Sequence, residues 1–178
     1  RDAAKAAPLL ARGIGSRFVV FDRNRSDIAV LRGLAPDVLV DAAGPFQASG
    51  TALPEACIAA GIHYIDIADA RDFVGGIARL DEKAKAANVA IISGASSTPA
   101  LSHAVLDELT KGWRRIDRVS AAIAPGNRTP RGLSVVRAIL TYAGKPVRVF
   151  DDGEWGEAPG WSLNQRIDLP GLKPRNAV

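Results

Sequence analysis

The stretch VLVDAAGPFQASGTALPEACIAAGIHYIDI (residues 38–67) decides the expected fold. Two short apolar runs, at 38–40 and 63–67, have the length of buried strands, and the amphipathic segment 52–60 between them ends at Gly61. A strand, a helix and a second strand in this order are typical of a parallel sheet covered by helices. The sequence therefore predicts a βαβ unit near the middle of the chain.

The alternation of strands and helices continues on both sides of this unit. It predicts strands at 17–22 and 89–92 and helices at 2–12, 26–34, 72–88 and 99–110. Asp72 and Thr98 are the expected N-caps of the last two helices. The apolar side chains expected to face inward from the last helix are Leu101, Val105, Leu106 and Leu109. Residues 1–112 are thus expected to form an α/β domain.

The sequence pattern changes after residue 112. Alternating apolar residues predict a strand at 114–125, followed by a helix at 133–142 and a strand at 145–150. Gly, Pro and Trp are frequent in the remainder, which has too few aliphatic residues to close a core alone. We interpret residues 113–178 as the beginning of a second, α+β domain.

Composition restricts the class of protein. Of 178 residues, 47% are apolar and 24% are charged, which excludes a disordered tail, a collagen or a coiled coil. No apolar run is long enough to span a membrane and no signal peptide begins the sequence, so we expect a cytoplasmic protein without a membrane partner. The single cysteine, Cys57, cannot form an intrachain disulfide and completes no zinc site, so no metal is expected.

Two further features of the composition are unusual. Methionine is absent, so residue 1 is interpreted as an internal position of a longer protein. Residues 113–178 carry a net charge of +5, whereas residues 1–112 carry −1. A basic segment fits either an anionic partner or a solvated surface. Its arginines are spread over strand and loop, with few aromatic stacking surfaces, so we expect no nucleic-acid partner.

Several common functional motifs are absent or misplaced. Gly13 and Gly15 precede a strand instead of following one, which suits a helix C-cap and not a dinucleotide fingerprint. The sequence contains no G-x-S-x-G nucleophile motif and no phosphate-loop motif. His63 and His103 are isolated, which suits structural roles better than that of a general base.

The informative residues are expected just after each strand, because ligands of an open parallel sheet lie beyond the carboxyl ends of its strands. Asp22 follows the first strand, where it either lies beside an adenine or acts as a turn carboxylate that caps the next helix. The segment 41–46 (DAAGPF) follows the second strand. Its small residues let the main chain approach a ligand, and Pro45 and Phe46 stiffen it, so we interpret it as a binding loop.

Carboxylates and hydroxyls follow the third and fourth strands. Asp66 and Asp69 end the third strand, and such a pair can orient a polar substrate or move a proton. Residues 93–99 (SGASSTP) end the fourth strand. Their hydroxyls and main-chain N–H groups either hold an anion or only cap the following helix.

Three of these segments together resemble one family. VLVDAAGPFQ (38–47), ACIAAGIHYIDIADARDF (56–73) and AIISGASSTPALSHAVLDEL (90–109) are similar in order and spacing to the NADP-binding domain of the saccharopine dehydrogenase/reductase family. The resemblance covers about residues 1–110. It implies a Rossmann-like, doubly wound parallel sheet that lacks its first strands here, and it implies NADP as the cofactor, with NAD as an alternative.

The resemblance also implies roles for individual residues. Arg1 would face the 2′-phosphate of NADP, and Asp22 would lie at the adenine side. The residues lining the nicotinamide side would be Ala43, Gly44, Pro45 and Phe46. Asp66 and Asp69 would face the gap between the two domains, where the substrate of family members lies.

The segment Thr98–His103 (TPALSH) departs from the family's usual Asp-Pro-Gly-Ile-Asp-His, which argues against saccharopine itself as the substrate. We therefore expect an NADP-dependent oxidoreductase that transfers a hydride to or from a small polar, amino-acid-like molecule, either as a single chain or as a homodimer. The alternative is a non-catalytic NADP-binding sensor or scaffold, since folds of this kind also host regulators.

Overall fold

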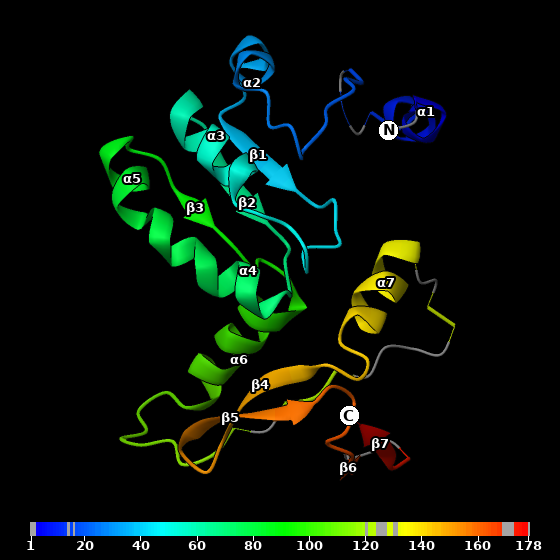
Figure 1. Cartoon of the computed structure of the whole chain (residues 1–178), viewed down its shortest axis with the longest axis vertical. Helices are drawn as coiled ribbons and strands as arrows, with labels where there is room; N and C mark the ends of the chain where they lie inside the picture. Colours follow the sequence, from blue (N-terminus) through cyan, green and yellow to red (C-terminus); the bar gives the residue numbers. More distant parts are fainter. Residues whose placement is uncertain are drawn as a thin grey trace.

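The computed structural model describes residues 3–13, 15, 17–119, 121–123, 128–129, 132–168 and 173–177 (Figure 1). The chain is mixed α/β, with a parallel sheet and its helices in one part and two antiparallel pairs of strands in the other. Its elements are α1 (Ala3–Ala11), α2 (Ile28–Leu34), β1 (Val38–Asp41), α3 (Ala52–Ala60), β2 (His63–Asp66), α4 (Arg71–Gly76), η1 (Ile77–Leu80), α5 (Asp81–Ala86), β3 (Ile91–Ile92), η2 (Ser97–Leu101), α6 (Ser102–Leu109), α7 (Leu133–Thr141), β4 (Pro146–Asp151), β5 (Glu154–Pro159), β6 (Gln165–Ile167) and β7 (Arg175–Ala177). Within the described ranges, no helix has the length and apolarity needed to cross a membrane.

The parallel sheet has the strand order β1-β2-β3. Asp41 at the end of β1 pairs with Asp66 at the end of β2, so the carboxyl ends of these strands lie level. Tyr64 of β2 pairs with Ile91 of β3. The central βαβ unit is confirmed, because β1 and β2 are parallel neighbours joined by α3.

Capping residues mark the ends of some of the helices, and others differ from the predicted bounds. The Asp27 side chain accepts a hydrogen bond from the Ala29 N–H at 2.9 Å and caps α2. Gly61 ends α3 at a φ of 73°. The expected helix at 72–88 is divided into α4, η1 and α5, and α4 follows Ala70 without a side-chain cap. The prediction of Asp72 as the N-cap is wrong, because Asp72 lies inside the first turn of α4.

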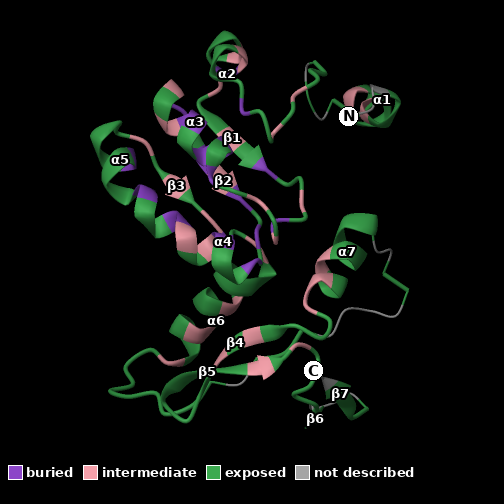
Figure 2. Ribbon diagram, in the orientation of Figure 1, coloured by how far each residue is buried: buried purple, intermediate pink, exposed green. Residues whose placement is uncertain are grey.

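The core lies on one face of the parallel sheet (Figure 2). One cluster packs Leu31 of α2 and residues of α3 against Tyr64, and a second packs α4 and η1 against Phe46. Leu39 and Ile91 are half-buried beneath these helices. Burial of each large apolar side chain stabilises the fold by about 1.5–3 kcal/mol.

The opposite face of the sheet is open in the described part of the chain. Val40 is 62% exposed and Ile92 is 49% exposed. A doubly wound sheet carries helices on both faces, whereas the described helices cover one. Of the four side chains predicted to face inward from the helix at 99–110, Leu101, Val105 and Leu109 are 61%, 49% and 70% exposed, and Leu106 is half-buried, so the prediction is wrong for three of them. The amphipathic pattern formed the helix, but most of its apolar face is exposed in the described part of the chain.

Two expected strands do not form. Residues 17–22 are without a strand partner, and Val20 is 71% exposed, although Phe21 packs against the core. The described residues of 114–123 also form no strand, and residues 120, 124 and 125 lie outside the described ranges. An apolar run becomes a strand only where a neighbouring strand satisfies its N–H and C=O groups.

Residues beyond 132 form α7 and two antiparallel pairs, β4–β5 and β6–β7. In the β4–β5 hairpin, Val147 pairs with Ala158 and Phe150 with Trp155. The Gly160 N–H donates to the Lys145 carbonyl at 2.8 Å, which joins the end of β5 to the residue before β4. The expected helix at 133–142 and strand at 145–150 are therefore present.

Cys57 gives a testable consequence of this core. It is fully buried on α3, and burial, with a smaller effect of Asp41, raises the pKa of its thiol from 9.0 to about 11. The folded state thus holds this proton more tightly, so its stabilising contribution is complete below pH 9 and declines as the pH rises toward 11. We expect the free energy of unfolding, measured by urea titration, to fall by about 2–3 kcal/mol over this range.

Cys57→Ala is the control for this prediction. The pKa of Tyr64 is also raised by burial and by Asp66 and Asp41. In the variant, the free energy of unfolding should therefore still decline above pH 10, the ordinary pKa of the Tyr64 phenol. The variant should lose the part of the decline that begins near pH 9. An identical pH profile in the wild type and in Cys57→Ala would contradict the assignment.

Candidate functional site

A buried polar group joins the carboxyl ends of β1 and β2. Asp41 and Asp66 are 4% and 0% exposed, and Tyr64 lies between their side chains. The Tyr64 hydroxyl donates to Asp41 Oδ2 at 3.4 Å. Burial and the two carboxylates raise the pKa of Tyr64, so its phenol stays protonated and remains a hydrogen-bond donor.

Asp66 uses one carboxylate oxygen to hold the loop after β3. Its Oδ1 accepts three hydrogen bonds, each at 2.9 Å, from the N–H groups of Ala68 and Gly94 and from the Ser93 hydroxyl. Its main-chain carbonyl accepts from the Ala95 N–H at 2.8 Å. Asp66 Oδ2 is buried without a hydrogen-bond partner among the described residues. Asp66 therefore fixes the positions of two loops, and its side chain is fully buried.

Arg23 anchors the loop that follows β1. Its Nη2 lies 3.0 Å from Asp41 Oδ2 and donates to Ser49 Oγ at 3.2 Å, and its Nη1 donates to the Ala43 carbonyl. The guanidinium also lies 4.8 Å from the centre of the Phe46 ring. One side chain thus connects the turn before α2, the end of β1 and both ends of the 43–49 segment.

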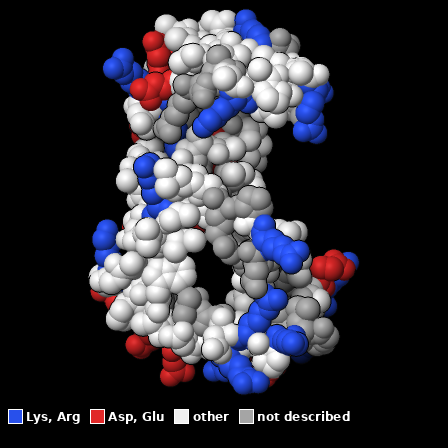
Figure 3. Space-filling model, turned by 90° about the vertical axis from the view of Figure 1, so that its right-hand side faces the viewer, with Lys and Arg blue, Asp and Glu red and all other residues white. Residues whose placement is uncertain are grey.

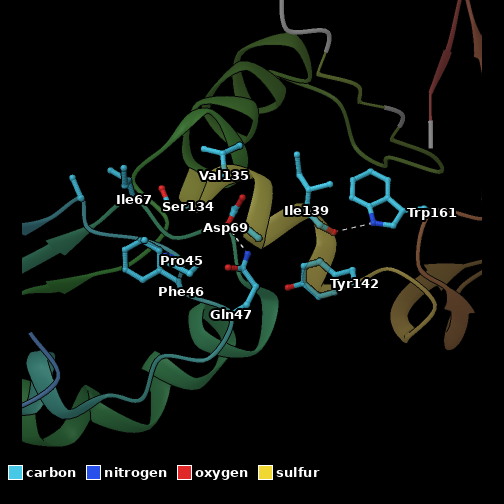
Figure 4. Close-up of a pocket in the computed structure, with 13 residues that line it drawn as sticks. Pro45, Phe46, Gln47, Ile67, Asp69, Ser134, Val135, Ile139, Tyr142 and Trp161 are labelled. Carbon is cyan, nitrogen blue, oxygen red and sulfur yellow. Dashed lines mark hydrogen bonds between the residues drawn. The ribbon is translucent and has the colours of Figure 1, made fainter. Parts of the chain in front are cut away.

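Asp69 lines a cavity between the sheet and α7, which we call the α7 cavity (Figure 4). The α7 cavity has a volume of about 300 Å³, within the usual range for a small-molecule site. Its apolar wall includes Pro45, Phe46, Ile67, Val135, Ile139 and Trp161. Gln47 Nε2 donates to Asp69 Oδ1 at 3.2 Å, and Trp161 Nε1 donates to the Ile139 carbonyl at 3.1 Å.

A larger cavity lies between α4, residues 98–99 and the β4–β5 hairpin, and we call it the hairpin cavity. Its volume is about 790 Å³, and Arg71 and Arg148 line it together with acidic residues. The Arg148 guanidinium lies 4.5 Å from the centre of the Trp155 ring, and Arg71 Nη1 donates to the Arg148 carbonyl. The hairpin cavity therefore presents cationic groups, aromatic surface and carboxylates to one space.

Asp69 and Tyr142 line both cavities and a third, of about 230 Å³, beside Trp161. Asp69 thus lies where the carboxyl edge of the sheet meets α7 and the hairpin. In the space-filling view the molecule is hollowed between its two ends, and basic side chains lie at both ends (Figure 3). Of the two predicted carboxylates, Asp69 alone lines these cavities.

The other predicted site residues are placed as follows. Asp22 is a turn residue: its Oδ1 accepts from the Asn24 N–H at 3.0 Å, and its side chain is 57% exposed. It does not cap α2, because Asp27 does. Gly44, Pro45 and Phe46 line the α7 cavity, and Ala43 contacts Arg23. Arg1 lies outside the described residues.

Two of the four hydroxyls of residues 93–98 are used within the protein. Ser93 donates to Asp66, and the Ser96 hydroxyl donates to the Thr98 carbonyl at 2.7 Å. Thr98 has the extended backbone that an N-cap residue adopts, at the kink within η2, but among the described residues its hydroxyl makes no capping hydrogen bond, so the predicted cap is present in backbone conformation only. These contacts favour a structural role for the segment over an anion site.

Four contributors to the site were not predicted: Arg23, Gln47, Tyr142 and Trp161. Gln47 directly follows the predicted binding loop 41–46 and carries an amide. A loop extended by one residue would have included it. Tyr142 and Trp161 lie in the second half of the chain, where no sequence pattern relates them to the sheet. Only the three-dimensional arrangement brings them to Asp69.

Within the described residues, no group of three or more His, Cys, Asp or Glu side chains could hold a metal ion. A scan of the chain against models of known protein families finds no match, and a search of curated proteins finds none either.

Proposed function

We propose that this chain is part of an NADP-dependent oxidoreductase of the saccharopine dehydrogenase-like type, which transfers a hydride to or from a small polar, amino-acid-like substrate. One observation carries the proposal: Asp69 and the loop residues 44–46, all at the carboxyl edge of the parallel sheet, line one cavity. This edge is where open parallel sheets bind ligands. The three sequence segments described above supply the link to the family.

The loop after β1 fits the nicotinamide end of such a cofactor. A Cβ added at Gly44 would meet only the Phe46 ring at 3.7 Å, so the main chain there is open to a close approach. Ala43, Gly44, Pro45 and Phe46 would hold the ring, with Arg23 fixing the loop from behind. When bound, NADP supplies hydride transfer at its nicotinamide C4. Asp22 remains proposed for the adenine side and Arg1 for the 2′-phosphate.

The charges around Asp69 fit a molecule with both an amine and a carboxylate. The Asp69 carboxylate can accept hydrogen bonds from an ammonium group or hold a proton during transfer. Arg71 and Arg148, which line the adjoining hairpin cavity, can bind a carboxylate. Asp66 would act as a positioning residue, because its carboxylate holds the loop beside Asp69 and does not line the cavity.

The proposal is tested by parallel fluorescence titrations of NADPH and NADH against the natural polypeptide that carries these 178 residues. We expect saturable binding, with NADPH at least about tenfold tighter, because an arginine beside the 2′-phosphate adds a charge-assisted contact. Comparable affinities would remove the role proposed for Arg1. Absence of binding by either nucleotide would remove the proposed function.

Asp69→Asn tests the role of the carboxylate. It replaces a charged acceptor by an amide of the same shape. With an amino acid or keto acid that the wild type turns over, we expect kcat/KM to fall about a hundredfold, while the Kd for NADPH changes less than twofold. Asp37→Asn, which removes the charge of an exposed carboxylate before β1 that lines none of the three cavities, is the matched control. Full kcat/KM in Asp69→Asn would remove the assignment.

A further inference from the structure

The β4–β5 hairpin leaves its two largest side chains open to the hairpin cavity. Phe150 and Trp155 are cross-strand partners, and their ring centres lie 5.2 Å apart with the ring planes at 61°. Both residues line the cavity, and they are 59% and 61% exposed. Val149 and Ala158 belong to the opposite face of the hairpin and are half-buried. The hairpin therefore packs its small apolar side chains and exposes its aromatic ones.

This arrangement is the reverse of the one that would stabilise the hairpin most. Burial of an aromatic side chain removes more apolar area from water than burial of a valine or an alanine. A hairpin that served only the fold would therefore place Phe150 and Trp155 on its packed face. Their exposure beside a cavity of about 790 Å³ favours a ligand as the apolar surface that covers them.

The charged groups next to the two rings fit an anion. The Arg148 guanidinium lies 4.5 Å from the centre of the Trp155 ring. Glu157 is the cross-strand partner of Arg148, but no ion pair within the described residues includes Arg148. Arg71 reaches the hairpin from α4, where its Nη1 donates to the Arg148 carbonyl. Two guanidinium groups, which bind carboxylates well, thus adjoin the aromatic pair.

The aromatic pair also selects the shape of the ligand. A guanidinium is planar and stacks on rings, so the face of Arg148 that turns away from Trp155 can take a further ring. Ring–ring contacts add to the gain from burial, which a saturated chain of the same size does not obtain. A cavity of about 790 Å³ lies within the usual range for a small-molecule site. An aromatic carboxylate therefore matches both the rings and the charges.

We infer that the substrate is an aromatic α-amino acid or the corresponding keto acid, whose ring packs on Phe150 and Trp155 while Arg71 and Arg148 bind its carboxylate. The inference rests on the proposed function for naming this ligand a substrate, and it adds the substrate class and two residues that determine specificity. Asp69 lines both the hairpin cavity and the α7 cavity, so the substrate and the cofactor can meet beside its carboxylate.

The chemistry balances with the cofactor and water alone. In the oxidative direction the α-carbon gives a hydride to the nicotinamide C4 of NADP⁺, and the ammonium group gives up one proton. The resulting iminium group reacts with water, which leaves the keto acid and an ammonium ion. In the reductive direction the same atoms move in the opposite sense.

The test titrates two matched pairs of small molecules into the natural polypeptide by calorimetry: phenylalanine with cyclohexylalanine, and phenylpyruvate with cyclohexylpyruvate. The amino acids are titrated with NADPH present and the keto acids with NADP⁺, so that no turnover occurs. The cyclohexyl ring is the more hydrophobic of the two, so burial alone favours it. In at least one pair we expect the aromatic member to bind at least about threefold more tightly. Absence of binding, or no aromatic preference in either pair, overturns the inference.

Variants connect the preference to the hairpin. Trp155→Leu and Phe150→Leu keep an apolar side chain and should each abolish most of the preference. Trp113→Leu is the matched control, because Trp113 is 65% exposed and lines none of the three cavities, and it should retain the preference. A thermal unfolding curve for each variant checks that it is folded. Preference retained in both hairpin variants, or lost equally in Trp113→Leu, overturns the inference.

NADPH is also titrated alone into each sample, so that the two proposals can fail separately. Tight NADPH binding without an aromatic preference overturns the inference and leaves the proposed function standing. An aromatic preference without NADPH binding supports the hairpin cavity as a site for an aromatic carboxylate and removes the proposed function.

Discussion

Gly94→Ala is expected to lower the free energy of unfolding by about 3–5 kcal/mol. Gly94 has a φ of +77°, a conformation that L side chains rarely adopt. A Cβ at this position would lie 2.8 and 2.9 Å from two ring carbons of Pro99, and the ring cannot rotate away. Any shift that relieved the contact would also disturb the Gly94 N–H bond to Asp66. Urea unfolding followed by circular dichroism measures the loss.

Gly61→Ala separates the two causes. Gly61 has a φ of +73°, close to that of Gly94, but a Cβ there meets nothing within 4 Å. In this variant the free energy of unfolding should fall only by the cost of holding an alanine at positive φ, about 1–2 kcal/mol. The difference between the two variants then reports the contact with Pro99. Equal losses in both variants would show that the loop after β3 moves freely.

The parallel unit was predictable because its signals are local. The apolar runs at 38–40 and 63–67 have strand length, and the helix between them has a glycine at its end. The position of the strand ends was predictable too, because the carboxyl ends of neighbouring parallel strands lie at the same edge of the sheet. For this reason Asp41, Asp66 and the loop after β1 are found together.

The difference between Asp66 and Asp69 depends on the side of the sheet. Successive side chains of a strand alternate between its faces, so Asp66 shares a face with Tyr64. That face is the covered one, and both side chains are fully buried. Asp69 follows the end of β2 and is free of this alternation. Two carboxylates three residues apart therefore lie in different surroundings, and the alternation in the sequence already contained that information.

The expected strand at 17–22 and the expected inward face of α6 failed for a different reason. Both segments have the apolar pattern of the predicted element. Such a pattern shows which side chains a segment can bury or which strand it can form, but not whether another element is there to pack against or pair with it. Val20 and Leu109 are 71% and 70% exposed in the described part of the chain. Arg23 shows the converse: no local pattern marks it, because its partner Asp41 lies 18 positions later and is brought near only by the fold.

Arg23→Ala is expected to destabilise the protein by about 3 kcal/mol. Its side chain is 13% exposed and that of Asp41 is 3% exposed, so the variant leaves a buried carboxylate without its cation. Arg25→Ala is the matched control: Arg25 is 87% exposed, lies 3.7 Å from Asp22, and should change stability by less than about 0.5 kcal/mol.

Arg23→Lys distinguishes charge from geometry in this anchor. Lysine keeps the cation beside Asp41 but cannot also reach the Ala43 carbonyl and Ser49 as the arginine fork does. It should therefore recover part of the stability lost in Arg23→Ala and leave the loop after β1 less firmly held. Chemical denaturation measures the first effect, and amide hydrogen exchange at residues 43–49 measures the second. Faster exchange in Arg23→Lys at restored stability would show that the guanidinium holds the loop itself. Unchanged exchange in both variants would mean that Arg23 serves only to neutralise Asp41, and that the loop proposed to hold the nicotinamide depends on Phe46 packing against Phe73, whose ring centres are 5.4 Å apart.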